Sequence, residues 1–143
     1  MRGIRTLDAR IRIHEENAGA IASALHQSSA VSKVYYPGLP WHPGHEIAVS
    51  QQSGFGGMIS FELEGGLDAV ETFLGSLECF TLAESLGGVE SLVAHPATMT
   101  HSSMEPAARE TAGITDSLLR LSVGIEHVED LLFDLQRALS FVE

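Results

Sequence analysis

An arginine stands in the middle of the most apolar strand-like segment of the chain, and it limits how that segment can fold. Residues 118–124 read Leu-Leu-Arg-Leu-Ser-Val-Gly, so alternate leucines share one face of a strand and Arg120 lies on the other. A guanidinium is always charged in proteins, and burying it without a partner is strongly unfavourable. Arg120 therefore needs a carboxylate, which either the protein or a bound ligand could supply. The protein's own candidates are Glu84, Glu90 and Glu126.

Periodicity along the chain predicts strands that alternate with helices. Apolar residues at helical spacing predict helices over residues 4–25, 45–52, 67–77, 105–112 and 128–142. Alternating or β-branched segments predict strands over residues 31–36, 58–63, 78–82, 91–95 and 118–124. The long opening helix and the short connections favour a small, mostly antiparallel sheet covered by helices on one side. This arrangement belongs to the α+β class.

The composition supports a single globular domain over residues 1–143. Hydrophobic residues make up 44% of the sequence and charged residues 19%, which is unlike a disordered chain. The formal net charge of -11 would repel nucleic acids and anionic membranes, so we expect neither as a partner. No apolar run reaches the length of a membrane span. The single cysteine, Cys79, fits a reducing compartment, which predicts the cytoplasm, and its place in a predicted strand suggests burial.

Six segments, in order along the chain, resemble the carboxy-terminal domain of the pyridoxal-phosphate (PLP) transsulfuration family of Cys/Met metabolism. The segments are RGIRTL (2–7), VYYPGLPWHPGH (34–45), GGMISF (56–61), FTLAESLGGVESL (80–92), HPATMTH (95–101) and LRLSVGIE (119–126). They look closest to the cystathionine gamma-lyase and gamma-synthase members. The resemblance implies the small carboxy-terminal domain of a fold-type-I PLP enzyme, with residues 1–27 as the interdomain helix.

The resemblance also implies roles for three residues. The arginine at the position of Arg120 would pair with the α-carboxylate of an amino-acid substrate, and the serine at Ser85 would help to hold it. An acid at Glu84 is typical of the gamma-lyase and gamma-synthase members, where it lies near the distal part of the substrate. The implied substrates are cystathionine, cysteine or a homoserine ester. The implied reaction breaks or forms a C–S bond at Cγ.

The sequence departs from the family's pattern in its lysines. Lys33 is the only lysine, and its context, Ser-Lys-Val-Tyr, does not match the family's PLP-binding lysine. The resemblance therefore implies that a large domain outside this chain binds PLP. We expect no catalytic, cofactor-binding or metal-binding residue here and no activity of the chain alone. As partners we expect the substrate, that large domain and further copies in a homo-oligomer.

Simpler explanations stay open on pattern alone. Arg120 could pair with one of the chain's own acids, Ser85 could be a turn hydroxyl, and Glu84 could be a solvated loop acid. His42 and His45 have a His-x-x-His spacing, for which loop packing is favoured over a metal site. The chain as a whole could be a non-catalytic truncated paralogue. It would then act as a self-association or interaction module through the apolar face that a large domain would otherwise cover.

Overall fold

A five-stranded sheet organises the computed structural model, which describes residues 3–142. The strands are β1 (Val31–Tyr35), β2 (Met58–Leu63), β3 (Thr81–Leu82), β4 (Leu92–Ala94) and β5 (Leu118–Ser122). The helices are the 3₁₀ turn η1 (Gly3–Thr6), α1 (Leu7–Gln27), α2 (His45–Gln51), α3 (Gly66–Ser76), α4 (Pro106–Thr111) and α5 (Val128–Leu139). Arg2, which opens the RGIRTL segment, lies outside the described residues. No helix within residues 3–142 is long and apolar enough to span a membrane.

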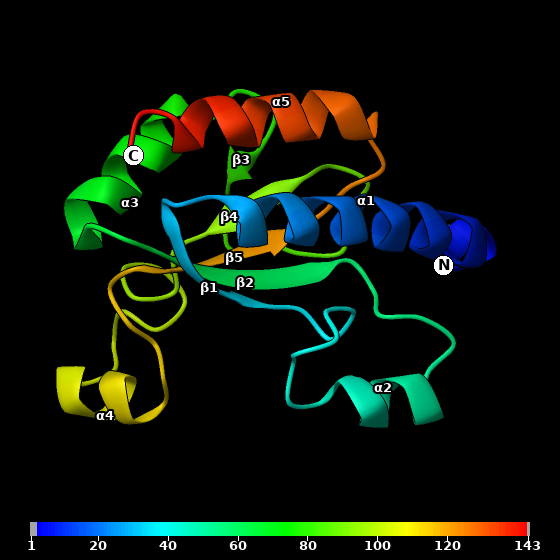
Figure 1. Ribbon diagram of the computed structural model, residues 1–143, viewed down its shortest axis with the longest axis horizontal. Helices are drawn as coiled ribbons and strands as arrows, with labels where there is room; N and C mark the ends of the chain where they lie inside the picture. Colours follow the sequence, from blue (N-terminus) through cyan, green and yellow to red (C-terminus); the bar gives the residue numbers. More distant parts are fainter. Residues whose placement is uncertain (1–2, 143) are drawn as a thin grey trace.

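The strands lie in the order β1-β2-β5-β4-β3. Neighbours are antiparallel, except that β3 and β4 are parallel. Helices α1, α3 and α5 lie over one face of this sheet, whereas α2 and α4 lie on the other side (Figure 1). The α+β class and the mostly antiparallel sheet are thereby confirmed.

The core lies between the sheet and the three helices over it. Residues Ile59, Phe61, Leu119 and Leu121 each expose 1% of their surface or less, and they alternate with more polar residues along β2 and β5. In an antiparallel sheet this alternation separates a buried face from a second face. Arg120 lies on the second face.

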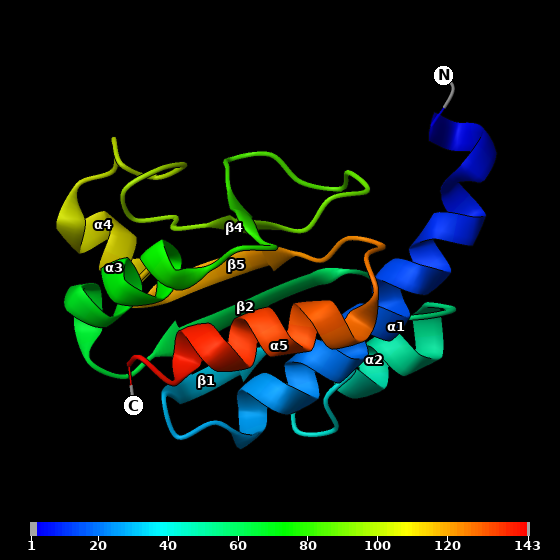
Figure 2. The ribbon, with the colours of Figure 1, turned by 90° about the horizontal axis from the view of Figure 1, so that it is seen from above.

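Helix α1 packs against the rest of the fold from His14 onward, whereas its first turns are largely exposed. Ile21 and Leu25 are buried, but Leu7 and Ile11 are 44% and 43% exposed, and Ile4 of the preceding turn η1 is 69% exposed. The reason is geometric, because the N-terminal half of the helix projects beyond the sheet (Figure 2). The amphipathic pattern thus correctly predicts a helix, while the apolar residues of its first turns are only partly covered by the described residues.

Strand β3 is shorter than the strand predicted over residues 78–82. The buried carboxylate of Asp134 accepts hydrogen bonds from the backbone N–H groups of Glu78, Cys79 and Phe80, with N···O distances of 2.8, 2.8 and 3.2 Å. These groups are therefore used by α5 and not by a strand ladder. Cys79 is exposed, so its predicted burial is wrong.

Candidate functional site

Arg120 lies at the centre of the sheet. Strand β5 has β2 on one side and β4 on the other, and Arg120 is paired with Ser60 and with Ala94 across these two ladders. Both neighbouring strands thus fix its backbone. The side chain is half-buried on the face opposite the core.

The guanidinium binds main-chain carbonyls. Its Nη2 donates to the carbonyl oxygens of Glu84 and Ser85, at 3.2 and 3.3 Å. Its Nε is buried and has no hydrogen-bond partner. Across residues 3–142, Arg120 forms no ion pair with a carboxylate. The described structure therefore does not contain the internal salt bridge that pattern alone left open.

The three candidate acids are engaged elsewhere or exposed. Glu126 accepts hydrogen bonds from the backbone N–H and the hydroxyl of Ser91, at 2.6 and 2.8 Å. The carboxylate of Glu90 lies over Gly88, where an added Cβ would be 2.5 Å from its oxygens. The side chain of Glu84 is exposed. Arg120 therefore retains donors for an external acceptor.

Glu84 and Ser85 come to Arg120 from the loop that joins β3 to β4. Their main-chain carbonyls contact the guanidinium, while both residues are exposed. Arg120, Ser85 and Glu84, the three residues predicted to bind substrate, thus lie together in the structure. A half-buried guanidinium with free donors favours a planar, bidentate acceptor such as a carboxylate.

Sequence reasoning did not single out Ser122 or Gly87, which also belong to this region. The buried hydroxyl of Ser122 accepts a hydrogen bond from the N–H of Gly87 at 2.8 Å. A small, mostly apolar pocket of about 140 Å³ adjoins this contact. Its lining includes Leu7, Ile11, His14, Met58 and Leu86. The only signal in the sequence was the spacing, since Ser122 stands two residues after Arg120 on the same face.

A second polar cluster surrounds Glu62 on the same sheet face. Its carboxylate accepts hydrogen bonds from the hydroxyls of Tyr35 (2.5 Å) and Thr115 (3.1 Å), and it lies 3.7 Å from Nζ of Lys33. Burial, and then the hydrogen bond to Glu62, raises the pKa of Tyr35 to about 12. This cluster holds the single lysine of the sequence.

Lys33 does not fit a PLP site. Its side chain is 63% exposed on edge strand β1, and its ammonium is paired with Glu62. A Schiff-base lysine needs an amine that can lose its proton, which desolvation promotes and a neighbouring carboxylate opposes. The residues around Lys33 therefore do not match what the cofactor needs.

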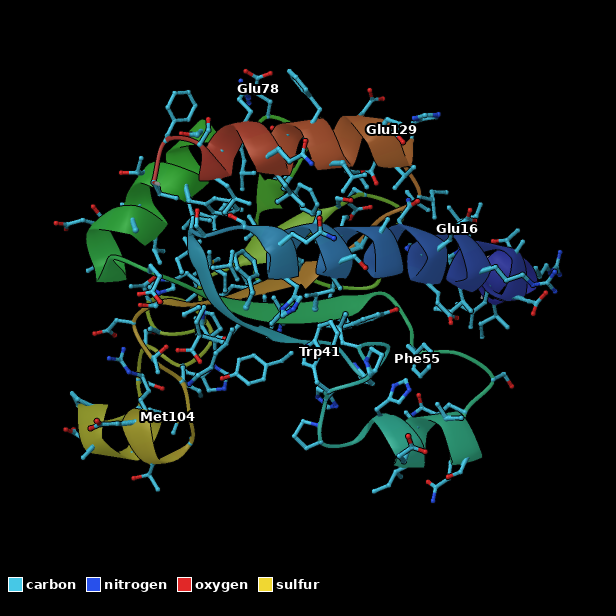
Figure 3. The ribbon with its side chains drawn as sticks, viewed as in Figure 1. Glu16, Trp41, Phe55, Glu78, Met104 and Glu129 are labelled. Carbon is cyan, nitrogen blue, oxygen red and sulfur yellow. The ribbon has the colours of Figure 1, made fainter. Side chains whose placement is uncertain are left out.

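His42 of the loop before α2 and His45, the first residue of α2, both bind the backbone of this loop. His45 Nδ1 lies 2.7 Å from the carbonyl oxygen of Pro37, and Gly44 N donates to His42 Nδ1 at 3.1 Å. Trp41 and Phe55, labelled in Figure 3, lie below the sheet on the side of α2. Residues 3–142 contain no group of three or more ligating side chains arranged for a metal ion.

Comparison with known proteins gives consistent matches. The family model for the Cys/Met metabolism PLP-dependent enzyme matches residues 1–140. The chain is 60% identical over 138 residues to a cystathionine beta-lyase of Lactococcus lactis, and 55% identical over 136 residues to the cystathionine gamma-synthase of Escherichia coli. It covers 96% and 95% of its own length in these matches, but only 36% and 35% of theirs.

A solved structure matches equally well. The cystathionine gamma synthase of Xanthomonas oryzae pv. oryzae, in complex with aminoacrylate and cysteine, superposes with a TM-score of 0.94 at 63% identity. The match covers 97% of this chain and 36% of that one. The chain therefore spans about a third of the length of these relatives. On the strength of these matches, the chain belongs to the Cys/Met metabolism PLP-dependent enzyme family.

Proposed function

We propose that the chain is the substrate-binding, carboxy-terminal small domain of a cystathionine gamma-lyase or gamma-synthase. In this proposal residues 1–27 connect it to a PLP-binding large domain in the cytoplasm. Arg120 binds the α-carboxylate of the substrate, Ser85 helps to hold it, and Glu84 faces the distal part. The complete enzyme breaks or forms a C–S bond.

The observation that carries the proposal is the unpaired state of Arg120. The guanidinium lies half-buried beside Glu84 and Ser85, with no carboxylate partner in residues 3–142. The α-carboxylate of an amino acid would supply the missing acceptor in planar geometry. Amino-acid ligands accompany a solved relative, which carries aminoacrylate and cysteine.

The role of this chain is therefore positional. Fixing a substrate's carboxylate on Arg120 orients the rest of the amino acid relative to the reacting groups, and such orientation lowers the barrier by removing motional freedom. PLP supplies the covalent chemistry in this family, and the surroundings of Lys33 support the proposal that the cofactor is held by the rest of the protein.

A chimaera tests the proposal. The matching segment of the Escherichia coli cystathionine gamma-synthase is replaced by this chain, and Arg120 is then changed to lysine. Lysine keeps the charge but loses the bidentate fork, so we expect the KM for the amino-acid substrate to rise at least roughly tenfold, consistent with the loss of one charge-assisted hydrogen bond.

Arg109→Lys is the matched control. Like Arg120, Arg109 donates to a main-chain carbonyl, that of Ala97 at 2.9 Å, but it also pairs with Asp116. We expect this variant to keep the KM of the parent chimaera. An Arg120→Lys chimaera with the same KM and kcat as its parent would contradict the proposal.

The apolar start of α1 favours a second candidate function. Ile4 of η1 and Leu7 and Ile11 of α1 are exposed at helical spacing, and an apolar stripe of this kind can drive self-association without any catalysis. Under this alternative the chain is an interaction module.

A further inference from the structure

The loop that carries Glu84 and Ser85 is attached to β5 and to the segment after it. Besides the two bonds from Arg120, the N–H of Gly87 donates to Ser122, and the N–H of Ile125 donates to the carbonyl of Val89 at 2.9 Å. Two side chains of β5 thus bind the loop: Arg120 binds the carbonyls of Glu84 and Ser85, and Ser122 binds the amide of Gly87.

The base of the loop is held by a separate network. Ser91 is fully buried; its hydroxyl donates to Glu126 and accepts from the N–H of Gly124, both at 2.8 Å. Asn17 of α1 donates to the carbonyls of Gly124 and Glu126, at 3.1 and 2.9 Å. This network fixes where the loop ends, but it does not reach the carbonyls that bind Arg120.

Arg120 and Ser122 hold the same loop from neighbouring positions. They are two residues apart on one strand, so both side chains leave the same face. Gly87 adopts a left-handed conformation, with φ 75°, which glycine tolerates and other residues rarely adopt. A turn at this glycine lets its N–H reach Ser122 while the preceding residues pass over the guanidinium.

We propose that Ser122 is a positioning residue, which sets the orientation of the Arg120 guanidinium through the loop carbonyls. Because those carbonyls occupy Nη2 alone, their position decides which donors stay available for an acceptor. Without the Ser122 bond, the loop can shift and the guanidinium follows it. As far as this concerns a substrate carboxylate, it rests on the proposed function.

The coupling can be measured on the chain itself by nuclear magnetic resonance. In ¹⁵N-labelled protein, the exchange rate of the Gly87 amide reports the Ser122 bond, and the Nε–H resonance of Arg120 reports the guanidinium. For Ser122→Ala we expect roughly tenfold faster exchange at Gly87, the size of one lost hydrogen bond. We also expect a changed Arg120 Nε–H shift and faster exchange there.

Two further variants complete the design. Ser50→Ala removes another serine bond, to the carbonyl of Ile47 at 2.9 Å on exposed α2, and should leave both signals unchanged. Ser122→Cys preserves the shape with a weaker acceptor and should give intermediate changes. If Ser122→Ala does not fold, the Gly87 exchange rate and the Arg120 Nε–H signal of Ser122→Cys provide the test instead.

Two results would overturn the inference. One is a Gly87 amide that exchanges freely in the unaltered chain. The other is an Arg120 Nε–H that stays unchanged while Gly87 loses protection, since Ser122 would then only tether the loop. A failed Arg120→Lys test in the chimaera would remove the proposed function, but it would not affect this coupling.

Discussion

At the scale of single residues, several polar side chains act by engaging the backbone of another segment. Arg120 binds two loop carbonyls, Ser122 binds a loop amide, and Asp134 binds three successive amides. A backbone group that is buried without a partner is costly. These side chains therefore fix loops that have no strand or helix ladder of their own.

The two tyrosines give a prediction about pH. Burial raises the pKa of both Tyr35 and Tyr36 from 10.0 to about 12, and Glu62 and Glu15 respectively add to the shift. Since these are the only tyrosines, ultraviolet titration of the folded chain should show little phenolate at pH 10. Each raised pKa contributes stability that is fully present below pH 10. The free energy of unfolding should therefore fall as the pH rises from 10 towards 12.

Glu62→Gln separates the two phenols. It removes the charge beside Tyr35 but not the one near Tyr36, so the pKa of Tyr35 alone should fall. The urea-unfolded chain, which should titrate near 10, serves as the reference. A folded chain that titrates as the unfolded one does would contradict the prediction.

At the scale of elements, helix α5 determines the local structure of the segment before β3. Asp134 accepts hydrogen bonds from the amides of residues 78–80, so these residues do not form the first part of the predicted strand. Arg137, one turn later, donates to Asp134 at 3.0 Å and to the carbonyl of Ser76 at 2.7 Å. Figure 3 shows Glu78 beside α5, where its carboxylate also pairs with Arg137.

Asp134→Asn tests this contact between elements. The amide keeps the shape but offers one acceptor oxygen in place of two, so at least one of the three N–H groups loses its acceptor beside a buried side chain. We expect about 3 kcal/mol lower free energy of unfolding, measured with urea. Asp130→Asn, an exposed change on the same helix, should cost less than about 0.5 kcal/mol.

The same variant has a chemical readout. Partial desolvation, and then the charge of Asp134, raise the pKa of the Cys79 thiol. Removing that charge should lower this pKa and speed alkylation of Cys79 at neutral pH. Equal stability of Asp134→Asn and the parent chain would rule out the role given to this carboxylate.

The elements that sequence predicts best are those whose pattern is local. Each of the five predicted strands and five predicted helices has a counterpart in the structure. The errors arise where a distant residue intervenes. Nothing near Cys79 in the sequence shows that Asp134 will bind its N–H, and nothing near Arg120 shows that Gly87 will approach Ser122.

At the scale of the whole molecule, the two faces of the sheet are covered differently. Three helices cover one face, and the first half of α1 projects beyond the sheet with its apolar residues exposed (Figures 1 and 2). The chain covers about a third of the length of the relatives it matches. An exposed apolar stripe of this kind is typical of a surface that another polypeptide covers.

Self-association follows as a prediction for the chain alone. At micromolar concentration the 15.3 kDa chain should sediment as an associated species in analytical ultracentrifugation. Leu7→Gln with Ile11→Gln should shift it to the monomer, because the two changes place polar groups in the stripe. Ile47→Gln with Val49→Gln, exposed positions on α2, should leave association unchanged. A parent chain that is monomeric at every concentration would contradict the prediction.

The continuity of α1 has a mechanical consequence. Its 21 residues form an unbroken rod about 31 Å long, at roughly 1.5 Å per residue. Near its middle, His14 and Asn17 bind the carbonyls of Val123 and Gly124, just past β5. Because the helix is continuous, a tilt of its exposed N-terminal turns would also move His14 and Asn17, and with them the end of the strand that carries Arg120.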